Sequence, residues 1–392
     1  MISPEQISKL VASYGAHSPS DITIGVLGGH SALDVCAGAK KYGFKTVAVC
    51  KDGRSSTYSK YFKTRDAANR AGDVIGCIDD VIILPSFGDI VNPEVQERLR
   101  KMKTIFVHNR YFWVYCDFNK IENDFNVPIF GTRHMLKLEE RDQPNNQYYL
   151  LKQAGIRTPK IFGTVGEIFE KKIDINQPVM VKVNEATRGY ERAFFVATTR
   201  EELSSKADEL MAKGTITKEG LMKAVVEEFI IGAQVNINYF YTPYSNEVEV
   251  MGTDMRRQTN LDGLLRMPAR QQMLLPESWQ PKMVETGHVA VTVKESLLEK
   301  MYDLGERFVK TTQKECAPGI IGPFALQGAV TAEEGKEEFV IFDVSMRIPG
   351  SPGTRFTPYT GYLYGENISV GERVAMEIAE GIKQGKLDRI VT

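Results

Sequence analysis

Two apolar runs near the C-terminus each carry an oxygen ligand of the kind that holds magnesium. Gln327 lies within residues 324–330, and Asp343 lies within residues 339–347. Both runs read as strands, and residues 331–338 between them predict a tight turn, so the two side chains should lie side by side. Amide and carboxylate oxygens suit Mg²⁺ held against the phosphates of a nucleotide. An ordinary hairpin with outward polar residues is the alternative interpretation.

Basic side chains elsewhere in the chain could bind the phosphates. Arg347 follows Asp343 closely and supplies a fixed positive charge for a phosphate or a carboxylate. Lys182 stands in the middle of an apolar, strand-like run, where a lysine is rarely buried without an anionic partner. Arg188 lies in the polar loop 184–192, which could close over a phosphate. The alternative for this loop is an edge hairpin whose charges prevent aggregation.

An acidic pair marks a candidate site for a nucleotide base. Glu227 and Glu228 end an apolar strand-like run that turns at a glycine. Backbone groups there could read an adenine, and a carboxylate could accept hydrogen bonds from amino or ribose hydroxyl groups. Further along, Arg256 and Asn260 lie in residues 256–263, which predict a polar turn rich in hydrogen-bond donors.

The first part of the chain alternates strands and helices, which predicts a doubly wound parallel sheet. The expected strands cover residues 22–27, 46–50, 80–84 and 104–107, and the expected helices cover residues 32–41 and 93–101. In such sheets ligands bind beyond the carboxyl ends of the strands, where Gly28, Gly29 and His30 fall.

The turn after the first strand is a candidate loop for a small ligand. Its two glycines are adjacent, so the spacing of a dinucleotide-binding fingerprint is absent. Ser31 could cap the following helix, and free N–H groups at the start of that helix would favour an anion such as a monophosphate. For His30 the alternative is a solvated histidine at a helix start.

Later elements should build a second, mixed region. Expected helices cover residues 135–141, 148–154, 200–213, 294–312 and 370–384. Expected strands begin at 156–160 and cover 179–183, 193–197, 224–232, 235–241 and 248–254. Strict alternation in residues 235–241 predicts a half-exposed antiparallel strand. The two last helices should flank the strands of Gln327 and Asp343.

The composition is that of an average globular protein. The chain has 392 residues and a formal net charge of -1, so we expect two or three domains and neither a nucleic acid nor a membrane as partner. Its five cysteines are widely spaced, which argues against disulfides and zinc, and fits the cytoplasm. The first residues carry no signal-peptide pattern.

Taken together, these motifs resemble the ATP-grasp superfamily and, more closely, the archaeal 5-formaminoimidazole-4-carboxamide ribonucleotide synthetase family. The resemblance extends over nearly the whole chain. It rests on the segments 27–33, 130–133, 150–155, 227–232, 260–263, 322–327, 342–347 and 361–364.

The resemblance implies α/β and α+β architecture, with an ATP-grasp fold preceded by a Rossmann-like parallel-sheet domain. The implied domains are residues 1–127, a linker and ATP-binding lobe at 128–242 whose smaller subdomain is about 156–232, and a C-terminal lobe with the metal site at 243–392. The implied chemistry is phosphorylation of formate to formyl phosphate by ATP, followed by attack of the amine of AICAR monophosphate, in purine biosynthesis.

The resemblance also assigns roles to individual residues. Lys182, Arg188, Glu227 and Glu228 would bind ATP, and Gln327 with Asp343 would bind Mg²⁺ or Mn²⁺. The substrate-binding residues would be His30, Ser31, Arg256 and Asn260, and Arg347 would be catalytic. Such a reaction needs positioning and charge neutralisation rather than a protein nucleophile.

Several positions depart from the family pattern. The loop after Lys182 keeps a single glycine, Tyr149 stands where a lysine is usual, and Asp343 replaces a glutamate. Bulky residues at 108–113 and an altered loop at 349–355 would reshape the acceptor pocket. An ATP-grasp ligase with another acid or acceptor, or a catalytically silent nucleotide-binding homologue, are therefore the alternatives. A homo-oligomer is possible for a member of this family.

Overall fold

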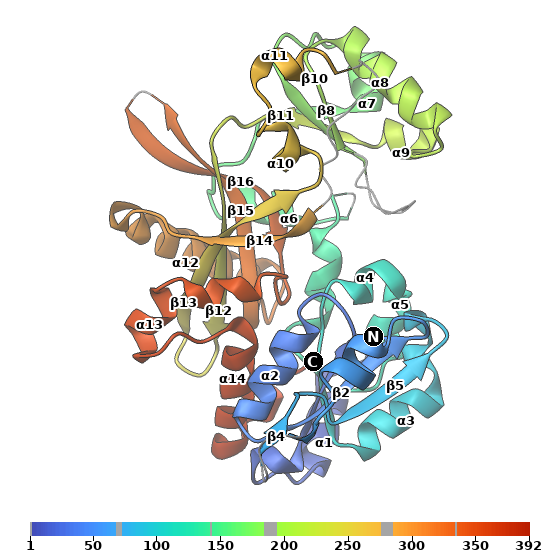
Figure 1. Cartoon of the computed structure of the whole chain (residues 1–392), viewed down its shortest axis with the longest axis vertical. Coiled ribbons are helices and arrows are strands. Elements are labelled where there is room, and N and C mark those ends of the chain that lie inside the picture. The colour runs from blue at the N-terminus through green and yellow to red at the C-terminus, as the bar shows by residue number, and fades with distance from the viewer. Residues whose placement is uncertain (1, 68–72, 142, 184–193, 276–284, 334) are drawn as a thin grey trace.

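The alternation of apolar strands and helices in the first 130 residues produces the expected parallel sheet. The structure is a computed structural model that describes residues 2–67, 73–141, 143–183, 194–275, 285–333 and 335–392 (Figure 1). The sheet has the strand order β5 (Asp80–Leu84), β2 (Lys45–Lys51), β1 (Thr23–Leu27), β6 (Thr104–Val107) and β7 (Ile129–Phe130), all parallel. Helices α2 (Ala32–Lys41) and α3 (Pro93–Lys101) have the predicted bounds. The N-terminal fold is therefore confirmed.

A small antiparallel sheet forms the upper lobe in Figure 1. Its strands, in order, are β10 (Phe194–Ala197), β9 (Val179–Lys182), β11 (Val225–Glu228) and β8 (Ile161–Thr164). Its helices are α7 (Val165–Glu170), α8 (Arg200–Ala212) and α9 (Lys218–Met222). The apolar residues of these strands and helices share one core, so the lobe is packed around its own interior.

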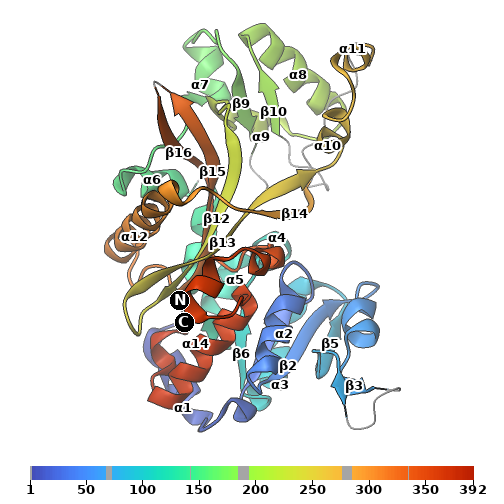
Figure 2. The ribbon, with the colours of Figure 1, turned by 60° about the vertical axis from the view of Figure 1, so that its left-hand side comes forward.

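A larger antiparallel sheet occupies the middle of the molecule (Figure 2). Its strand order is β14 (Glu285–Val291), β13 (Glu247–Gln258), β12 (Ala233–Thr242), β15 (Gly322–Glu333) and β16 (Lys336–Ser345). Helices α6 (Gln147–Gln153) and α12 (Leu298–Glu315) share a hydrophobic core with it. As predicted, Gln327 and Asp343 are directly opposite each other on neighbouring strands.

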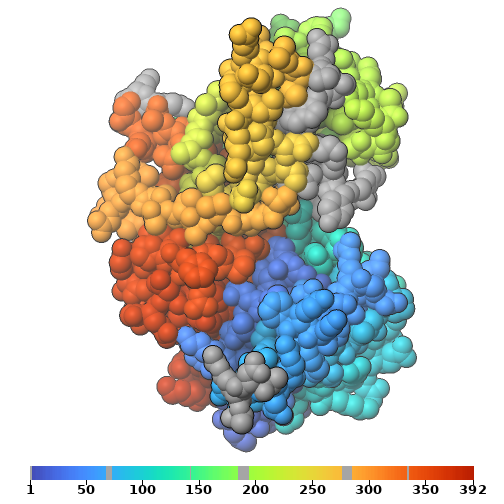
Figure 3. Space-filling view, viewed as in Figure 1, coloured from blue at the N-terminus to red at the C-terminus, as the bar shows by residue number. Residues whose placement is uncertain are grey.

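The remaining elements are short except for α1 and α14. They are α1 (Pro4–Ser13), β3 (Arg65–Asp66), β4 (Val74–Ile75), α4 (Tyr111–Tyr115), α5 (Phe118–Asn123), α10 (Leu261–Leu264), α11 (Ala269–Gln272), α13 (Tyr359–Tyr364) and α14 (Val370–Gln384). The gold segment that carries α10 and α11 covers the front of the upper half, beside the small lobe (Figure 3). No helix in the described ranges is long and apolar enough to cross a membrane.

Several expected boundaries were wrong. Residues 331–338 are not simply a turn, because β15 continues to Glu333 and β16 begins at Lys336. Arg256 and Arg257 belong to strand β13 rather than to a turn. The strand expected from residue 156 begins only at Ile161.

Strand β12 is buried rather than half-exposed. Val235, Ile237 and Tyr239 pack into the core shared with α12. On the opposite face, Asn236 and Asn238 are also buried. The alternation of apolar and polar residues therefore separates a core from a polar site, and does not separate a core from solvent.

The helix expected at residues 135–141 is a 3-10 segment at Arg133–Glu139. Side chains three residues apart align in this conformation. Met135 and Leu138 accordingly both enter the core of the central sheet, while Leu136 enters that of the N-terminal sheet.

The C-terminal residues return to the N-terminal sheet. Helix α14 packs against α2, where Gly38 and Gly371 allow the two backbones to touch, and is only partly a flank of the central sheet. The last two residues then pair with β7, with Val391 opposite Phe130 and Thr392 hydrogen-bonded to Ile129 in both directions.

Candidate active site

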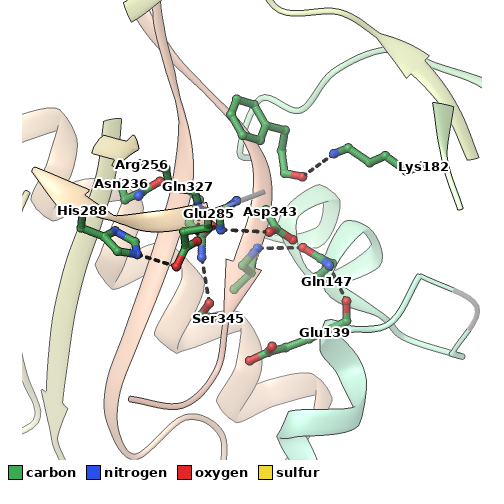
Figure 4. Close-up of polar contacts among 12 residues, drawn as sticks. Glu139, Gln147, Lys182, Asn236, Arg256, Glu285, His288, Gln327, Asp343 and Ser345 are labelled. Carbon is green, nitrogen blue, oxygen red and sulfur yellow. Dashed lines mark hydrogen bonds and ion pairs between the residues drawn. The ribbon is translucent and has the colours of Figure 1, made fainter. Parts of the chain in front are cut away.

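Four polar residues lie in one row across the central sheet. Asn236 on β12 is opposite Asp254 on β13 and Gln327 on β15, and Gln327 is opposite Asp343 on β16. Residues directly opposite in antiparallel strands project to the same face and lie about 5 Å apart. The row therefore connects two ends of a site, one near Lys182 and the other near His288 (Figure 4).

Lys182 and Glu227 form a buried ion pair at the first end. Lys182 Nζ lies 2.5 Å from Glu227 Oε1, and the two side chains are 6% and 2% exposed. Lys182 also donates to the carbonyl of Phe342 at 3.0 Å, and the Tyr148 hydroxyl donates to Glu227. Strands β9 and β11 are antiparallel neighbours in which Lys182 is opposite Val225 and Glu227 is opposite Met180, so the two side chains share one face and meet diagonally. The predicted anionic partner of the strand lysine is thus a glutamate of the predicted acidic pair.

Aromatic rings surround this ammonium group. Lys182 Nζ lies 5.5 to 5.9 Å from the ring centroids of Phe342, Tyr148 and Phe194. Arg141 lies over two of the same rings, those of Tyr148 and Phe194. Cations held over rings in this way keep their charge with little surrounding water.

The predicted metal ligands converge on a positive charge. Arg256 donates through Nη2 to Gln327 Oε1, and the same nitrogen lies 3.6 Å from Asp343 Oδ2. Arg141 donates to the other carboxylate oxygen of Asp343 at 3.0 Å. The two ligand oxygens are hard and already hold a cation between them, so this donor set fits Mg²⁺, which usually takes one or two protein oxygens and completes its shell with water and phosphates. Among the described residues, no cluster of three or more His, Cys, Asp or Glu side chains offers an alternative metal site.

Arg347 lies beyond this pair, next to His30 and Glu139. Its Nη1 is 3.3 Å from His30 Nε2, and its Nε is 3.6 Å from Glu139 Oε1. Glu139 accepts a hydrogen bond from the backbone N–H of Met346 at 2.7 Å, and burial raises the pKa of Glu139 although the Arg347 charge opposes this. A fixed carboxylate therefore orients the guanidinium from behind.

His30 is held in one tautomer by its neighbours. Ser31 donates to the carbonyl of Pro349, so its oxygen accepts from His30 Nδ1 at 2.7 Å. His30 Nε2 then accepts from Arg347. Ser31 does not cap helix α2 with its side chain, contrary to expectation, because its hydroxyl is used in this contact. It positions His30.

The adjacent glycines serve packing. A Cβ at Gly29 would lie 2.1 Å from the Tyr111 ring, and one at Gly28 would lie 2.8 Å from the Cys50 sulfur. Only glycine permits this close approach. The turn after β1 is thus shaped by its neighbours Tyr111 and Cys50.

Asp254 organises the second end of the row. Its carboxylate accepts from Asn236 Nδ2 at 2.9 Å, from Asn238 Nδ2 at 2.7 Å and from His288 Nδ1. His288 Nε2 donates to Glu285 at 2.9 Å. Burial would lower the pKa of His288, but the hydrogen bonds to Asp254 and Glu285 outweigh it and raise that pKa to about 9. The imidazole is therefore a cation at neutral pH.

These residues line a polar pocket. His30, Asn236, Asp254, His288 and Arg347 all contribute to its wall, which the loop 349–351 completes. A neighbouring pocket is lined by Glu139, Arg141 and Asp343. Arg110, Arg256, Ser345 and Arg347 line both, so four side chains join the two spaces.

The structure does not bring every predicted site residue together. Asn260 is exposed at the start of α10 and is not part of either pocket wall. Glu228 accepts a hydrogen bond from the backbone N–H of Lys160 rather than joining Glu227 at Lys182. Tyr149 donates to Glu315 on α12 at 2.8 Å. Arg188 lies outside the described residues.

Sequence reasoning missed five residues of the site, namely Glu139, Arg141, Asn236, Asp254 and His288. One signal was available: the repeated asparagines of β12, which alternate with core residues. The others come from segments far apart in the sequence, and only the fold shows that they converge.

The fold is shared with enzymes that have been solved with nucleotides. An ADP complex of purK, an N5-carboxyaminoimidazole ribonucleotide synthetase, matches with a TM-score of 0.56 at 12% identity, covering 90% of this chain and 79% of that one. The biotin carboxylase of Campylobacter jejuni, in complex with β,γ-ATP, matches with a TM-score of 0.55 at 13% identity, covering 91% and 71%. The structure is therefore an ATP-grasp fold, as expected.

Closer relatives identify the family. The IMP biosynthesis protein PurP of Thermococcus kodakaraensis has a TM-score of 0.67 at 25% identity, covering 94% of this chain and 100% of that one. Two family models match, a protein of unknown function (DUF1246) at residues 24–162 and a domain of unknown function (DUF1297) at residues 202–392.

Curated relatives carry a specific name. A 5-formaminoimidazole-4-carboxamide-1-(beta)-D-ribofuranosyl 5'-monophosphate synthetase of Methanopyrus kandleri is 36% identical over 392 residues, all of both chains. Its namesake in Methanothermobacter thermautotrophicus is 38% identical over 379 residues, 96% of each chain. The chain belongs to this synthetase family, a family of ATP-grasp ligases, which confirms the resemblance.

Proposed function

We propose that this chain is an ATP-dependent ligase that joins formate to the amine of AICAR monophosphate, through formyl phosphate, in purine biosynthesis. The observation that carries the proposal is the row from Asp343 through Gln327 and Asn236 to Asp254. It connects a cationic end at Lys182 with a polar pocket at His288. This is the order in which a phosphoryl donor, a metal and an acceptor must lie for a transfer between them.

Each end of the site has a distinct task in this proposal. Lys182 and Arg141 would bind the phosphates of ATP, and Glu227 keeps the lysine in place. Gln327 and Asp343 would hold Mg²⁺ or Mn²⁺, which would neutralise phosphate charge and align the transferred group. Glu228 remains a candidate for the nucleotide's ribose or base.

The acid and the acceptor would meet where the two pockets join. Arg256 and Arg347 line both pockets and are suited to formate and to the acyl phosphate made from it. His30 and the Asp254–His288 pair surround the space left for the acceptor nucleotide. Proximity and fixed charge supply the catalysis, because phosphoryl and acyl transfer of this kind need no protein nucleophile.

Purified protein tests this function directly. With ATP, Mg²⁺, formate and AICAR monophosphate, we expect stoichiometric release of ADP and formation of the formylated nucleotide. Release of ADP with a different acid or acceptor would instead identify a ligase of altered specificity. ATP binding without turnover on any acid would identify a silent nucleotide-binding homologue.

Asp343→Asn tests the metal role within that assay. The substitution keeps the size of the side chain but removes the charge that Mg²⁺ requires, so turnover should fall at least about 100-fold, as when a central charge in a phosphoryl-transfer site is lost. Asp262→Asn is the matched control, since Asp262 pairs with Arg257 outside both pockets. Normal turnover by Asp343→Asn, with an unchanged melting temperature, would remove the metal assignment.

A further inference from the structure

One buried oxygen of the acceptor pocket has no hydrogen-bond partner among the described residues. It is Oδ1 of Asn236, a residue that is 3% exposed. Leaving such an acceptor unpaired costs about 1–3 kcal/mol, so native proteins pair nearly all of them. An orphaned acceptor in a pocket wall indicates a ligand that donates to it.

The orientation of this amide is fixed. Asn236 Nδ2 donates to Asp254 Oδ2 at 2.9 Å. A carboxylate only accepts hydrogen bonds, so the amide must present its nitrogen to Asp254 and turn its oxygen away. Asp254 is itself held by Asn238 and His288, which prevents it from adjusting.

Asn238 provides an internal comparison. It lies two residues further along β12, on the same face, and also donates to Asp254. Its Oδ1, however, accepts from the Ser351 hydroxyl at 3.0 Å. Two asparagines therefore donate to one carboxylate, and the protein supplies a hydrogen-bond donor to the amide oxygen of Asn238 but, among the described residues, none to that of Asn236.

The position of Asn236 in the row indicates which group of the acceptor it meets. Its neighbour on β15 is Gln327, next to Asp343, where the metal and the transferred group would lie. Arg256 and Arg347 line the same pocket, where their Nε atoms lie 3.2 Å from Glu285 Oε2 and 3.6 Å from Glu139 Oε1, and these guanidinium groups held by carboxylates suit the anionic reaction partner.

We propose that Asn236 Oδ1 accepts a hydrogen bond from the reacting amine of the acceptor nucleotide and so positions it for attack. The assignment rests on the proposed function. An amide oxygen is neutral and does not remove the proton. It holds one N–H and leaves the nitrogen lone pair directed at the acyl carbon. As the C–N bond forms, the bond from the acyl carbon to phosphate breaks, and the departing phosphate takes the proton from the amine. The hydrogen bond to Asn236 strengthens as positive charge develops on nitrogen during attack.

The test is a cycle that combines a change in the protein with a change in the ligand. Binding is measured by calorimetry for AICAR monophosphate and for the same nucleotide with hydrogen in place of the 5-amino group. Wild-type protein should bind the intact nucleotide about tenfold more tightly than the analogue, and Asn236→Ala should bind the two about equally. Unchanged ATP affinity in the variant shows that the fold is retained.

Asn238→Ala is the matched control. It removes an equivalent bond to Asp254 but no orphaned acceptor, so its preference for the amine should stay close to that of the wild type. A preference that survives in Asn236→Ala, or that disappears equally in both variants, would overturn the assignment. The assignment would also be wrong if Asn236→Ala altered binding only through the carboxamide of the ligand, as an analogue with a carboxylate in place of the carboxamide would show.

Failure of this inference and failure of the proposed function are separable. If wild-type protein neither binds AICAR monophosphate nor releases ADP with it, the proposed function fails and Asn236 loses its role with it. If wild-type protein binds and formylates the nucleotide but the cycle shows no coupling, only the Asn236 assignment is wrong.

Discussion

The lysine at the nucleotide end of the site shows how a buried charge is kept ready for a ligand. Lys182 is enclosed by aromatic rings and would lose too much hydration to remain there alone. Glu227 at 2.5 Å supplies the opposite charge. Such a pair contributes little net stability, since desolvation offsets attraction, but breaking it is costly. Function rather than stability is therefore the better explanation for it.

This balance gives a prediction for paired variants. Lys182→Met should destabilise the protein by about 3–5 kcal/mol, because the buried Glu227 carboxylate loses its partner. Lys182→Met combined with Glu227→Gln should recover most of that stability, as measured by urea unfolding. ATP affinity should stay low in both, because neither restores the cation. Recovery of ATP binding in the double variant would contradict the phosphate role of Lys182.

A second residue-scale prediction concerns pH. The pKa of His288 is raised to about 9 in the folded chain, against an ordinary value near 6.5, and its side chain is 13% exposed. A raised pKa stabilises the fold fully below about pH 6.5, and this stabilisation is lost as pH rises through 9. It amounts to up to about 3 kcal/mol, because each tenfold gain in proton affinity on folding contributes about 1.4 kcal/mol.

Unfolding of His288→Gln tests this linkage. The free energy of unfolding of the wild type should exceed that of His288→Gln by the largest amount at pH 6, and the difference should shrink towards pH 10. His17→Gln, at an exposed position, is the control and should differ equally from wild type at both values. An advantage of the His288 form that is independent of pH would mean that the imidazole is not charged in the folded state.

At the scale of elements, the local sequence was sufficient to predict the bounds of a helix or strand wherever the spacing of apolar residues follows from burial alone. Helix α2 and strand β5 have their predicted bounds because apolar spacing and flanking turn residues define them. Strand β12 was misjudged because its polar positions are buried in a site, and alternation alone cannot distinguish a polar pocket from solvent. The Asp254–His288 pair could not be predicted from local sequence, because 26 residues (259–284) separate strand β13 from its partner β14.

The crossing of α2 and α14 gives an element-scale prediction. A Cβ at Gly38 would lie 2.4 Å from the backbone of Gly371 and Glu372, so Gly38→Ala must push the helices apart. We expect the free energy of unfolding, measured in urea, to fall by about 1–3 kcal/mol, which is typical of overpacking. Gly263→Ala, in α10 with open space around it, is the control and should be neutral or slightly stabilising. Equal effects of the two substitutions would show that the helix contact is not tight.

At the scale of the whole molecule, segments that lie far apart in the sequence are held together. The predicted domains, 1–127, 128–242 and 243–392, remain a prediction that limited proteolysis would test. Contacts nevertheless cross the proposed boundaries, because Arg133 donates to the carbonyls of Ile121, Phe125, Val127 and Thr392. Four charge-assisted bonds from one buried guanidinium make these segments interdependent.

The pairing of Thr392 with Ile129 also bears on how the chain folds as it is synthesised. The strands of the N-terminal sheet leave the ribosome well before the helix that covers α2 and the residues that pair with β7. Until then the face of α2 around Gly38 and the edge of β7 are exposed to other chains. A nascent chain of this protein should therefore depend on chaperones for most of its translation, even though its first sheet is made of strongly strand-forming sequence.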